Sequence, residues 1–276
     1  MTAPTHHQQQ PGVGYASPIP VRKAHLGDAL ASEWTKIRSV RSTMWTLGVM
    51  ILLMAGIGLG FAAIVASSGV STEGESALPL GFFGVLLGSI CVITLGVLTI
   101  ASEYGTGMIR TTLTACPSRA RVLTAKALVF FLLVFTVTTL TAGFVAVVQV
   151  ALVDAAEPTG QEWLRATVGV GLFIALLGLL ALAVGAMIRH SAGAITLMIG
   201  LMLLPLVAAM FMFSESLVEI QRVLLDYSIP SQIIALYSEA TPDGTGPAGW
   251  EPMWIMLGAA AVAMGGAYLT LQSRDV

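Results

Sequence analysis

The sequence predicts an all-α integral membrane protein with six transmembrane helices. Of its 276 residues, 56% are hydrophobic and 10% are charged, whereas a soluble globular domain has roughly 25% charged residues. The apolar residues form six blocks of about 20, the length that crosses a hydrocarbon core of roughly 30 Å. No block contains Asp, Glu, Lys, Arg or His; an Asp, Lys or Arg at the centre of a helix would cost about 2.5–3.5 kcal/mol. The expected spans cover residues 44–66, 80–101, 128–153, 166–188, 192–213 and 253–271.

The distribution of Lys and Arg predicts that both termini lie in the cytoplasm. With the N-terminus inside, 11 of the 13 Lys and Arg residues fall on the cytoplasmic side, in agreement with the positive-inside rule. Only Arg165 and Arg222 fall outside. We therefore expect an N-in, C-in transmembrane domain over residues 44–272. The preceding residues 1–21 hold four prolines and no apolar run, and this composition predicts a disordered cytoplasmic tail.

Residues 22–43 predict an amphipathic helix in front of the first span. An apolar stripe recurs at helical spacing while cations take other faces. The stripe carries Leu30, Trp34 and Ile37, and the cations beside it are Lys36 and Arg38. Because this helix directly precedes a span, we expect it to lie in the inner membrane interface. An ordinary cytosolic helix is the alternative.

The long connection at residues 214–252 predicts a short external helical hairpin before the last span. Ser216 and Glu219 have the spacing of a capping box, and apolar residues follow on one helical stripe. Pro230 then interrupts, a second apolar run follows, and a Gly/Pro-rich loop closes the segment. We expect two short helices that dip into the outer leaflet. The alternative is an amphipathic hairpin that rests on the surface.

Small and polar residues within the spans predict how the helices pack. Glycines recur at spacings of four and seven residues, which lets helix backbones approach closely; they are Gly56, Gly60, Gly84, Gly88, Gly171, Gly178 and Gly185. We expect packing within the chain, with an interface between subunits as the alternative. Gln149 is expected to form a hydrogen bond to a neighbouring helix or to backbone.

The residues needed for catalysis or nucleotide binding are missing from the sequence. No acid, base or metal-ligand cluster lies within the spans, and Cys91 and Cys116 suit neither a disulfide framework nor a metal site. A phosphate-binding loop of the type GxxxxGKS or GxxxxGKT is absent. We therefore expect no enzyme activity, no catalytic residue, no metal and no cofactor in this chain. The energy for any uphill transport must then come from another polypeptide.

The first cytoplasmic loop, residues 102–126, has a pattern suited to docking on a partner. Two glycines precede a short apolar and basic segment, and Pro117 with Ser118 then starts a basic helix that leads into the third span. A basic loop at the lipid head groups would explain the cations, but not Met108 and Ile109 on a water-facing segment. We expect Met108 and Ile109 to insert into a groove on the partner. The residues assigned to this coupling element are Glu103, Tyr104, Gly105, Gly107, Met108, Ile109, Arg110, Leu113, Pro117 and Arg119.

Two segments, SEWTKIRSVRSTMW before the first span and ASEYGTGMIRTTLTACPSRARVLTAK after the second, resemble the type-2 ABC exporter (ABC-2) permease family. The first is similar to the family's amphipathic connecting helix, and the second to its Glu–Gly–(Leu/Met/Ile) coupling loop ending in Pro-x-x-Arg and a Lys. The resemblance implies a multi-pass protein of the bacterial plasma membrane that pairs with a second permease copy or paralogue. It also implies binding of separate cytoplasmic ABC ATPase subunits, which hold the ATP and Mg, and no nucleic acid partner.

The sequence therefore favours the membrane-spanning permease subunit of an ATP-binding-cassette exporter. Its charge-free spans favour an apolar or amphipathic cargo, such as a drug, a lipid-like molecule or a small peptide, and residues 214–250 would form an external gate. The substrate-binding residues stay unassigned. The alternative is a non-transporting membrane anchor or sensor that uses the same loop to dock a cytoplasmic regulator.

Overall fold

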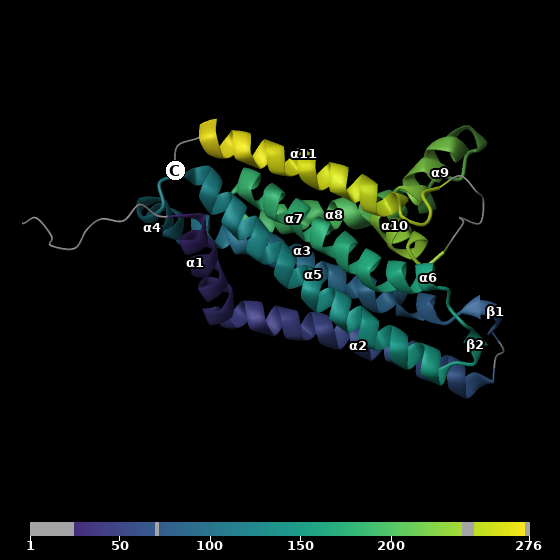
Figure 1. Ribbon diagram of the computed structural model, residues 1–276. Coiled ribbons are helices and arrows are strands. Elements are labelled where there is room, and N and C mark those ends of the chain that lie inside the picture. Colours follow the sequence, from purple (N-terminus) through teal and green to yellow (C-terminus); the bar gives the residue numbers. More distant parts are fainter. Residues whose placement is uncertain (1–24, 70–71, 239–245, 274–276) are drawn as a thin grey trace, which may run out of the picture.

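The computed structural model describes residues 25–69, 72–238 and 246–273, and this part of the chain is almost entirely helical (Figure 1). Within it, six helical stretches are long and apolar enough to cross a membrane, and each overlaps one of the predicted blocks. The prediction of an all-α, multi-pass membrane protein is confirmed. The predicted tail at residues 1–21 lies outside the described residues. The stretches are α2 (Arg41–Ser68), η1 with α3 (Leu78–Gly81 and Phe82–Gly105), α5 (Arg119–Leu152), α6, η2 and α7 (Gly160–Leu164, Arg165–Gly169 and Val170–Ile188), α8 (Ser191–Met210) and α11 (Glu251–Ser273).

The spans lie alongside one another in a bundle with two distinct ends (Figure 1). One end, at the left of the figure, carries the C-terminal end of α11 together with α1 (Leu26–Ser39) and α4 (Met108–Ala115). The opposite end carries β1 (Thr72–Ser76), β2 (Ala155–Ala156), α9 (Val218–Asp226) and α10 (Ile229–Ala235). These are called the α4 end and the α9 end. The start of the first span and the end of the last span thus lie at the same end of the bundle, as an even number of spans requires.

Small residues allow α7 to pack closely against its neighbours at the centre of the bundle. A Cβ atom on Gly96 of α3 would lie 2.5 Å from the carbonyl oxygen of Gly178 on α7, and one on Gly178 would lie 2.7 Å from the ring of Phe130 on α5. Both contacts are too close for a real Cβ, so these helices can approach only at glycine. Gly56 and Gly60 of α2, by contrast, have no such neighbour within 4 Å. The predicted close packing within the chain is confirmed for Gly84, Gly88, Gly171, Gly178 and Gly185.

The Gly96→Ala substitution is expected to destabilise the contact between α3 and α7 by about 1–3 kcal/mol, the usual cost of overpacking a close interface. The added methyl group would meet the backbone of Gly178, which cannot rotate away as a side chain can. Gly60→Ala is the matched control, because a Cβ there meets nothing within 4 Å. Thermal unfolding in one detergent should show a lowered midpoint for Gly96→Ala alone. Equal midpoints would contradict this packing.

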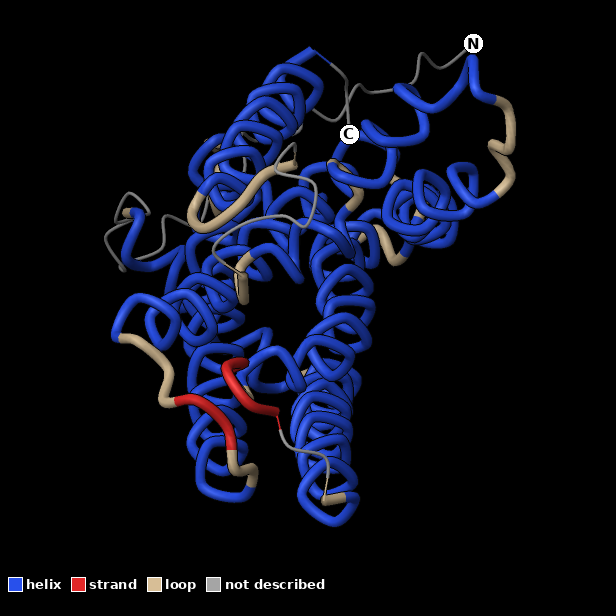
Figure 2. The backbone as a smooth tube through the Cα atoms, turned by 90° about the vertical axis from the view of Figure 1, so that its right-hand side faces the viewer, coloured by secondary structure: helices blue, strands red, loops and turns tan. Residues whose placement is uncertain are grey.

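The loops at the α9 end contain two short strands that the sequence did not predict. β1 and β2 pair in parallel, with Thr72 opposite Ala155 and Ser76 opposite Ala156, and Figure 2 shows the two strands side by side. The pairing joins the loop after α2 to the loop after α5. Neither segment has the apolar alternation that marks a strand in a sequence. The pairing therefore follows from the positions at which α2 and α5 end.

The segment before α11 contains two short helices with different surroundings. α10 packs on α3 and α8, with Ile229 buried at 6% exposure and Ile233 at 0%. α9 leaves apolar residues exposed, Val218 by 42% and Val223 by 56%. The predicted capping box is wrong, because Ser216 lies in the 3₁₀ turn η3 (Glu215–Leu217) and α9 begins only at Val218, without a side-chain cap.

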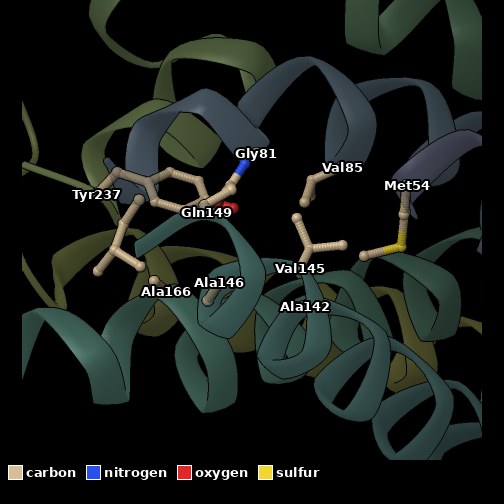
Figure 3. Close-up of a pocket in the computed structure, with 10 residues that line it drawn as sticks. Met54, Gly81, Val85, Ala142, Val145, Ala146, Gln149, Ala166 and Tyr237 are labelled. Atoms are coloured by element: carbon tan, nitrogen blue, oxygen red, sulfur yellow. The ribbon is translucent and has the colours of Figure 1, made fainter. Parts of the chain in front are cut away.

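Gln149 of α5 lies at a meeting point of several elements near the α9 end. Its amide nitrogen donates a 3.1 Å hydrogen bond to the carbonyl oxygen of Gly58 on α2, which confirms the predicted role between helices. Figure 3 shows Gln149 beside Gly81 and Tyr237, around a cavity of about 10 Å³. A cavity of this size holds about one water molecule, so it is too small for a cargo molecule.

Candidate coupling site

α4 is a two-turn helix between the ends of α3 and α5. Gly107 precedes it with a φ of 73°, a left-handed conformation that glycine adopts without strain. After α4, the side chain of Ser118 accepts a 3.4 Å hydrogen bond from the backbone N–H of Arg121 and caps α5. The glycine break, the short helix and the helix restart expected in residues 102–126 are therefore present. α5 continues without a break to Leu152, so the basic segment and the third span form one helix.

The outward face of α4 differs from the one expected. Met108 is 48% exposed, whereas Ile109 is only 5% exposed. Ile109 therefore faces the bundle, whereas Met108 faces away from it. The expectation that both are available to a partner is wrong for Ile109, which is buried within this chain. Met108 and Arg110 lie on the exposed side of α4.

A buried cluster of ion pairs joins α1, α3 and α5, and one hydrogen bond joins this cluster to α4. Nζ of Lys126 lies 2.7 Å from Oε2 of Glu33 and 2.9 Å from Oε1 of Glu103. Nζ of Lys36 lies 2.7 Å from Oε1 of Glu33 and 3.0 Å from Oε1 of Glu103. Lys36 also donates a 3.3 Å hydrogen bond to Oγ1 of Thr112 on α4. Glu33, Lys36, Glu103 and Lys126 are called the ion cluster below.

Burial makes the ion cluster sensitive to the loss of any one member. Lys126 is 1% exposed, Glu33 3% and Glu103 6%. Removing a buried charge from water costs several kcal/mol per ion unless close partners compensate. Here each ammonium group contacts both carboxylates, so the formal charges balance. Removing one lysine would leave two buried carboxylates with a single partner.

Lys36 is the partly exposed member of the ion cluster, and its surroundings keep it charged. Burial alone would lower the pKa of its ammonium group, but the hydrogen bonds and charges of Glu33 and Glu103 outweigh this effect and raise the pKa above its ordinary value. A group with a raised pKa stabilises the folded state below that pKa and loses this contribution as the pH rises through it. The contribution of Lys36 is therefore fully present throughout the neutral range.

Further contacts connect the α4 end to α7 and α11. The guanidinium group of Arg119 donates a 2.7 Å hydrogen bond to the carbonyl oxygen of Leu271 on α11, and the hydroxyl oxygens of Thr124 and Tyr268 lie 2.6 Å apart. Arg189, directly after α7, places its guanidinium carbon 4.9 Å from the ring centre of Tyr104, a cation–π contact. Most spans therefore end at a polar contact near α4.

The structure places the other predicted site residues at the same end of the bundle. On α1, Ile37 is buried and Leu30 is half-buried, whereas Arg38 and Trp34 are exposed. The predicted stripe is therefore rotated, since Trp34 does not face the bundle and Glu33 does. Among the remaining residues of the coupling element, Gly105, Gly107 and Pro117 are exposed, and Tyr104, Leu113 and Arg119 are half-buried.

Sequence reasoning selected Lys36 and Glu103 but missed the ion cluster that they form with Glu33 and Lys126. The one available signal was the spacing of Glu33 and Lys36, three residues apart on one helix. Pairs at this spacing are common on solvated helix surfaces and carry little weight. Burial of the pair follows only from the contact of α1 with α3 and α5.

The chemistry of the α4 end consists of ion pairs and apolar contacts. Among the described residues, no group of three or more His, Cys, Asp or Glu side chains is placed to hold a metal ion. Cys91 and Cys116 are both free thiols. This arrangement can hold helix ends together and present a surface to a partner.

A comparison with known protein families decides the family of this chain. The model described as ABC-2 family transporter protein matches residues 29–205, more than half of the chain. This chain belongs to the ABC-2 transporter family. The matched part of this ABC-2 protein includes the whole ion cluster and all of α4. ABC-2 proteins are membrane components of ABC transporters, generally without catalytic activity, and in general work with an ABC ATPase. A search of the curated proteins found no match.

Proposed function

We propose that this ABC-2 chain is the permease subunit of an exporter driven by a separate ABC ATPase, and that α4 is the element on which the ATPase acts. The observation that carries the proposal is the connection of α4 to three other helices through the ion cluster. Thr112 on α4 contacts Lys36, which contacts Glu103 at the end of α3. In this proposal, a partner that displaced α4 would act on α1, α3 and α5 through the hydrogen bond between Thr112 and Lys36.

Met108 supports α4 as the contact surface for the ATPase. Its side chain is 48% exposed at the end of the bundle, and burying this exposed half in a groove would contribute about 1 kcal/mol. ATP and Mg would be held by the partner, whose movements reach the permease at α4. In this proposal α1 is the connecting helix in the inner membrane interface, with exposed Trp34 beside the lipid head groups.

The proposed cargo is apolar or amphipathic and leaves the cytoplasm through a path formed with a second permease copy or paralogue. The blocks between the helix ends hold no Asp, Glu, Lys, Arg or His, which disfavours a multiply charged cargo. The cavity beside Gln149 has a volume of only about 10 Å³, so a passage needs surfaces from two permeases. In this proposal α9 and α10 cover its outer mouth.

The orientation can be tested with single cysteines at the two ends of the bundle, in a Cys91→Ala, Cys116→Ala background. Ala120 beside α4 and Gly160 at the start of α6 are both exposed. If the α4 end faces the cytoplasm, Gly160→Cys should react with an impermeant thiol reagent in intact cells. Ala120→Cys should react only after permeabilisation. Labelling of position 120 in sealed cells would overturn the N-in orientation.

ATP hydrolysis should depend on a second polypeptide. The chain purified alone should neither bind nor hydrolyse ATP, because it has no phosphate-binding loop. Phosphate release should appear only when an ABC ATPase co-purifies. Turnover by the rigorously purified single chain would contradict the proposal. A stable complex that hydrolyses ATP but moves no amphipathic cargo would favour the anchor or sensor alternative.

A further inference from the structure

A crevice with both polar and apolar walls lies at the α4 end, between α1 and α2 on one side and α3 and α4 on the other. Its volume is about 340 Å³, near the lower end of the roughly 300–1,000 Å³ that small-molecule pockets occupy. Its lining runs from Thr46 of α2 and Leu95 of α3 to Glu103 and Lys126 of the ion cluster. The crevice therefore joins the ion cluster to the adjoining ends of two spans.

The crevice walls offer mainly hydrogen-bond acceptors. Seven Ser and Thr residues line the crevice, and five of them donate their only hydroxyl hydrogen to a backbone carbonyl three or four residues earlier. A hydroxyl group whose hydrogen is already used can offer only its lone pairs. These walls therefore favour a ligand that donates hydrogen bonds. The five residues are Ser39, Thr46, Thr99, Ser102 and Thr106.

The ion cluster adds a carboxylate oxygen to this set of acceptors. Oε1 of Glu103 contacts both lysines, whereas Oε2 is buried and has no hydrogen-bond partner among the described residues. A buried acceptor that lacks a donor is unfavourable. Since Oε2 has less than 1 Å² of exposed surface, a ligand N–H in the crevice would reach it only after a rotation of the Glu103 side chain, and such a bond would satisfy this oxygen. The three hydrogens of Lys36 already go to Glu33, Glu103 and Thr112. Lys36 therefore has no N–H left for an anionic ligand, and the two ammonium groups of the ion cluster balance the charge of its two carboxylates.

Polarity changes along one face of α3 as it does along an amphipathic molecule. Leu95, Thr99 and Glu103 all line the crevice, and a spacing of four residues places them on one helix face. This face passes from apolar through hydroxyl to carboxylate toward the α4 end. A lipid passes in the same order from hydrocarbon chain to headgroup.

We propose that the crevice binds the primary ammonium headgroup of a membrane amphiphile, with Glu103 and Thr99 accepting its N–H groups and its chain lying along Leu95. A primary ammonium group carries three N–H donors. A quaternary ammonium group has none and is usually bound by aromatic cages, whereas none of the described residues that line this crevice is aromatic. The inference that this ligand is a cargo rests on the proposed export function. Binding of the ligand to the crevice can be tested on the permease chain alone.

The test is lipid binding to the delipidated, purified chain, measured by native mass spectrometry in detergent. Phosphatidylethanolamine, phosphatidylcholine and phosphatidylglycerol with identical acyl chains are compared. We expect phosphatidylethanolamine to bind at least about tenfold more tightly than the other two, the ratio that one charge-assisted hydrogen bond confers. If octadecylamine competes as well as phosphatidylethanolamine, the site binds amphipathic amines in general. If free ethanolamine competes equally well, the acyl chain does not contribute to binding, and the proposal that the ligand is a membrane amphiphile is overturned.

Matched substitutions on α3 locate the binding site. Thr99→Val removes an acceptor from the crevice and should weaken phosphatidylethanolamine binding several-fold, without affecting phosphatidylcholine. Thr94→Val is the control, because Thr94 makes the same kind of hydrogen bond to its own helix, 2.9 Å to the carbonyl of Ile90, but does not line the crevice. Glu103→Gln should weaken binding at least about tenfold. Thermal unfolding is recorded for each variant. If Glu103→Gln does not fold, the comparison of Thr99→Val with Thr94→Val decides the test.

Two results would overturn the inference: equal binding of the three lipids, or equal effects of Thr99→Val and Thr94→Val. Neither result bears on the ATPase, because the assay contains only the permease chain. Failure of an ABC ATPase to co-purify would instead overturn the proposed function and leave ammonium-selective binding in place. The two failures are therefore distinguishable.

Discussion

Lys126→Met is expected to lower the free energy of unfolding by about 3–5 kcal/mol, the range found when one partner of a buried ion pair is removed. Lys126 is 1% exposed and contacts Glu33 at 2.7 Å and Glu103 at 2.9 Å. Methionine fills a similar volume, so packing is kept while the charge is lost. Two buried carboxylates would then share only Lys36. The measurement is thermal or denaturant-induced unfolding of the purified variant in detergent.

Two further variants separate charge balance from packing at this position. Lys36→Met should be less harmful, because the side chain of Lys36 is 26% exposed and water can replace part of its contacts. Adding Glu103→Gln to Lys126→Met should recover part of the lost stability, since the double variant again has equal numbers of positive and negative charges. If Lys126→Met is as stable as the wild type, or if the double variant is the sum of the two single losses, the ion cluster does not hold these helices as described.

The membrane-spanning fold was predictable from the sequence because hydrocarbon excludes charge. Blocks without ionisable residues marked all six spans, and Ser118 before a basic segment marked the restart of α5. The helix ends were less predictable. The predicted basic helix and the third span form one helix, α5, and α2 begins at Arg41, before the predicted span, because charged residues at the ends of a helix can reach the membrane interface.

The coupling site was predictable only in outline, because its key contacts join distant segments. Glu33 appears in the sequence as an ordinary polar residue of an amphipathic helix, and its burial depends on Lys126, 93 residues away. Ile109 appears as an exposed apolar residue because it lies in a loop outside the spans, but α4 turns it inward to 5% exposure. Local spacing identified the helices, but it could not specify which side of each helix faces the bundle.

Met108→Asp is expected to weaken binding of the ABC ATPase by at least about a hundredfold. Docking would bury the exposed half of the methionine side chain, which accounts for about 1 kcal/mol, and burying an unpaired aspartate adds a penalty of several kcal/mol. Each tenfold change in affinity needs only about 1.4 kcal/mol. Met108 is 48% exposed in the chain itself, so the substitution should leave folding and membrane insertion intact.

Ile109→Asp is the informative comparison, because its side chain packs inside the chain. An aspartate there would bury a charge against the bundle, and the expected result is less folded protein in the membrane. Gln161→Asp, at an exposed position of α6 on the opposite end, controls for surface charge and should change neither folding nor ATPase binding. The three variants together separate loss of docking from loss of the fold.

The most direct test of the central claim is quantitative co-purification of the ABC ATPase with tagged wild-type, Met108→Asp and Gln161→Asp permeases from membranes that contain equal amounts of each. If the ABC ATPase acts on α4, wild type and Gln161→Asp retain the ATPase, and Met108→Asp loses it together with ATP-driven export. Retention of both the ATPase and export by Met108→Asp would show that α4 is not the element on which the ATPase acts.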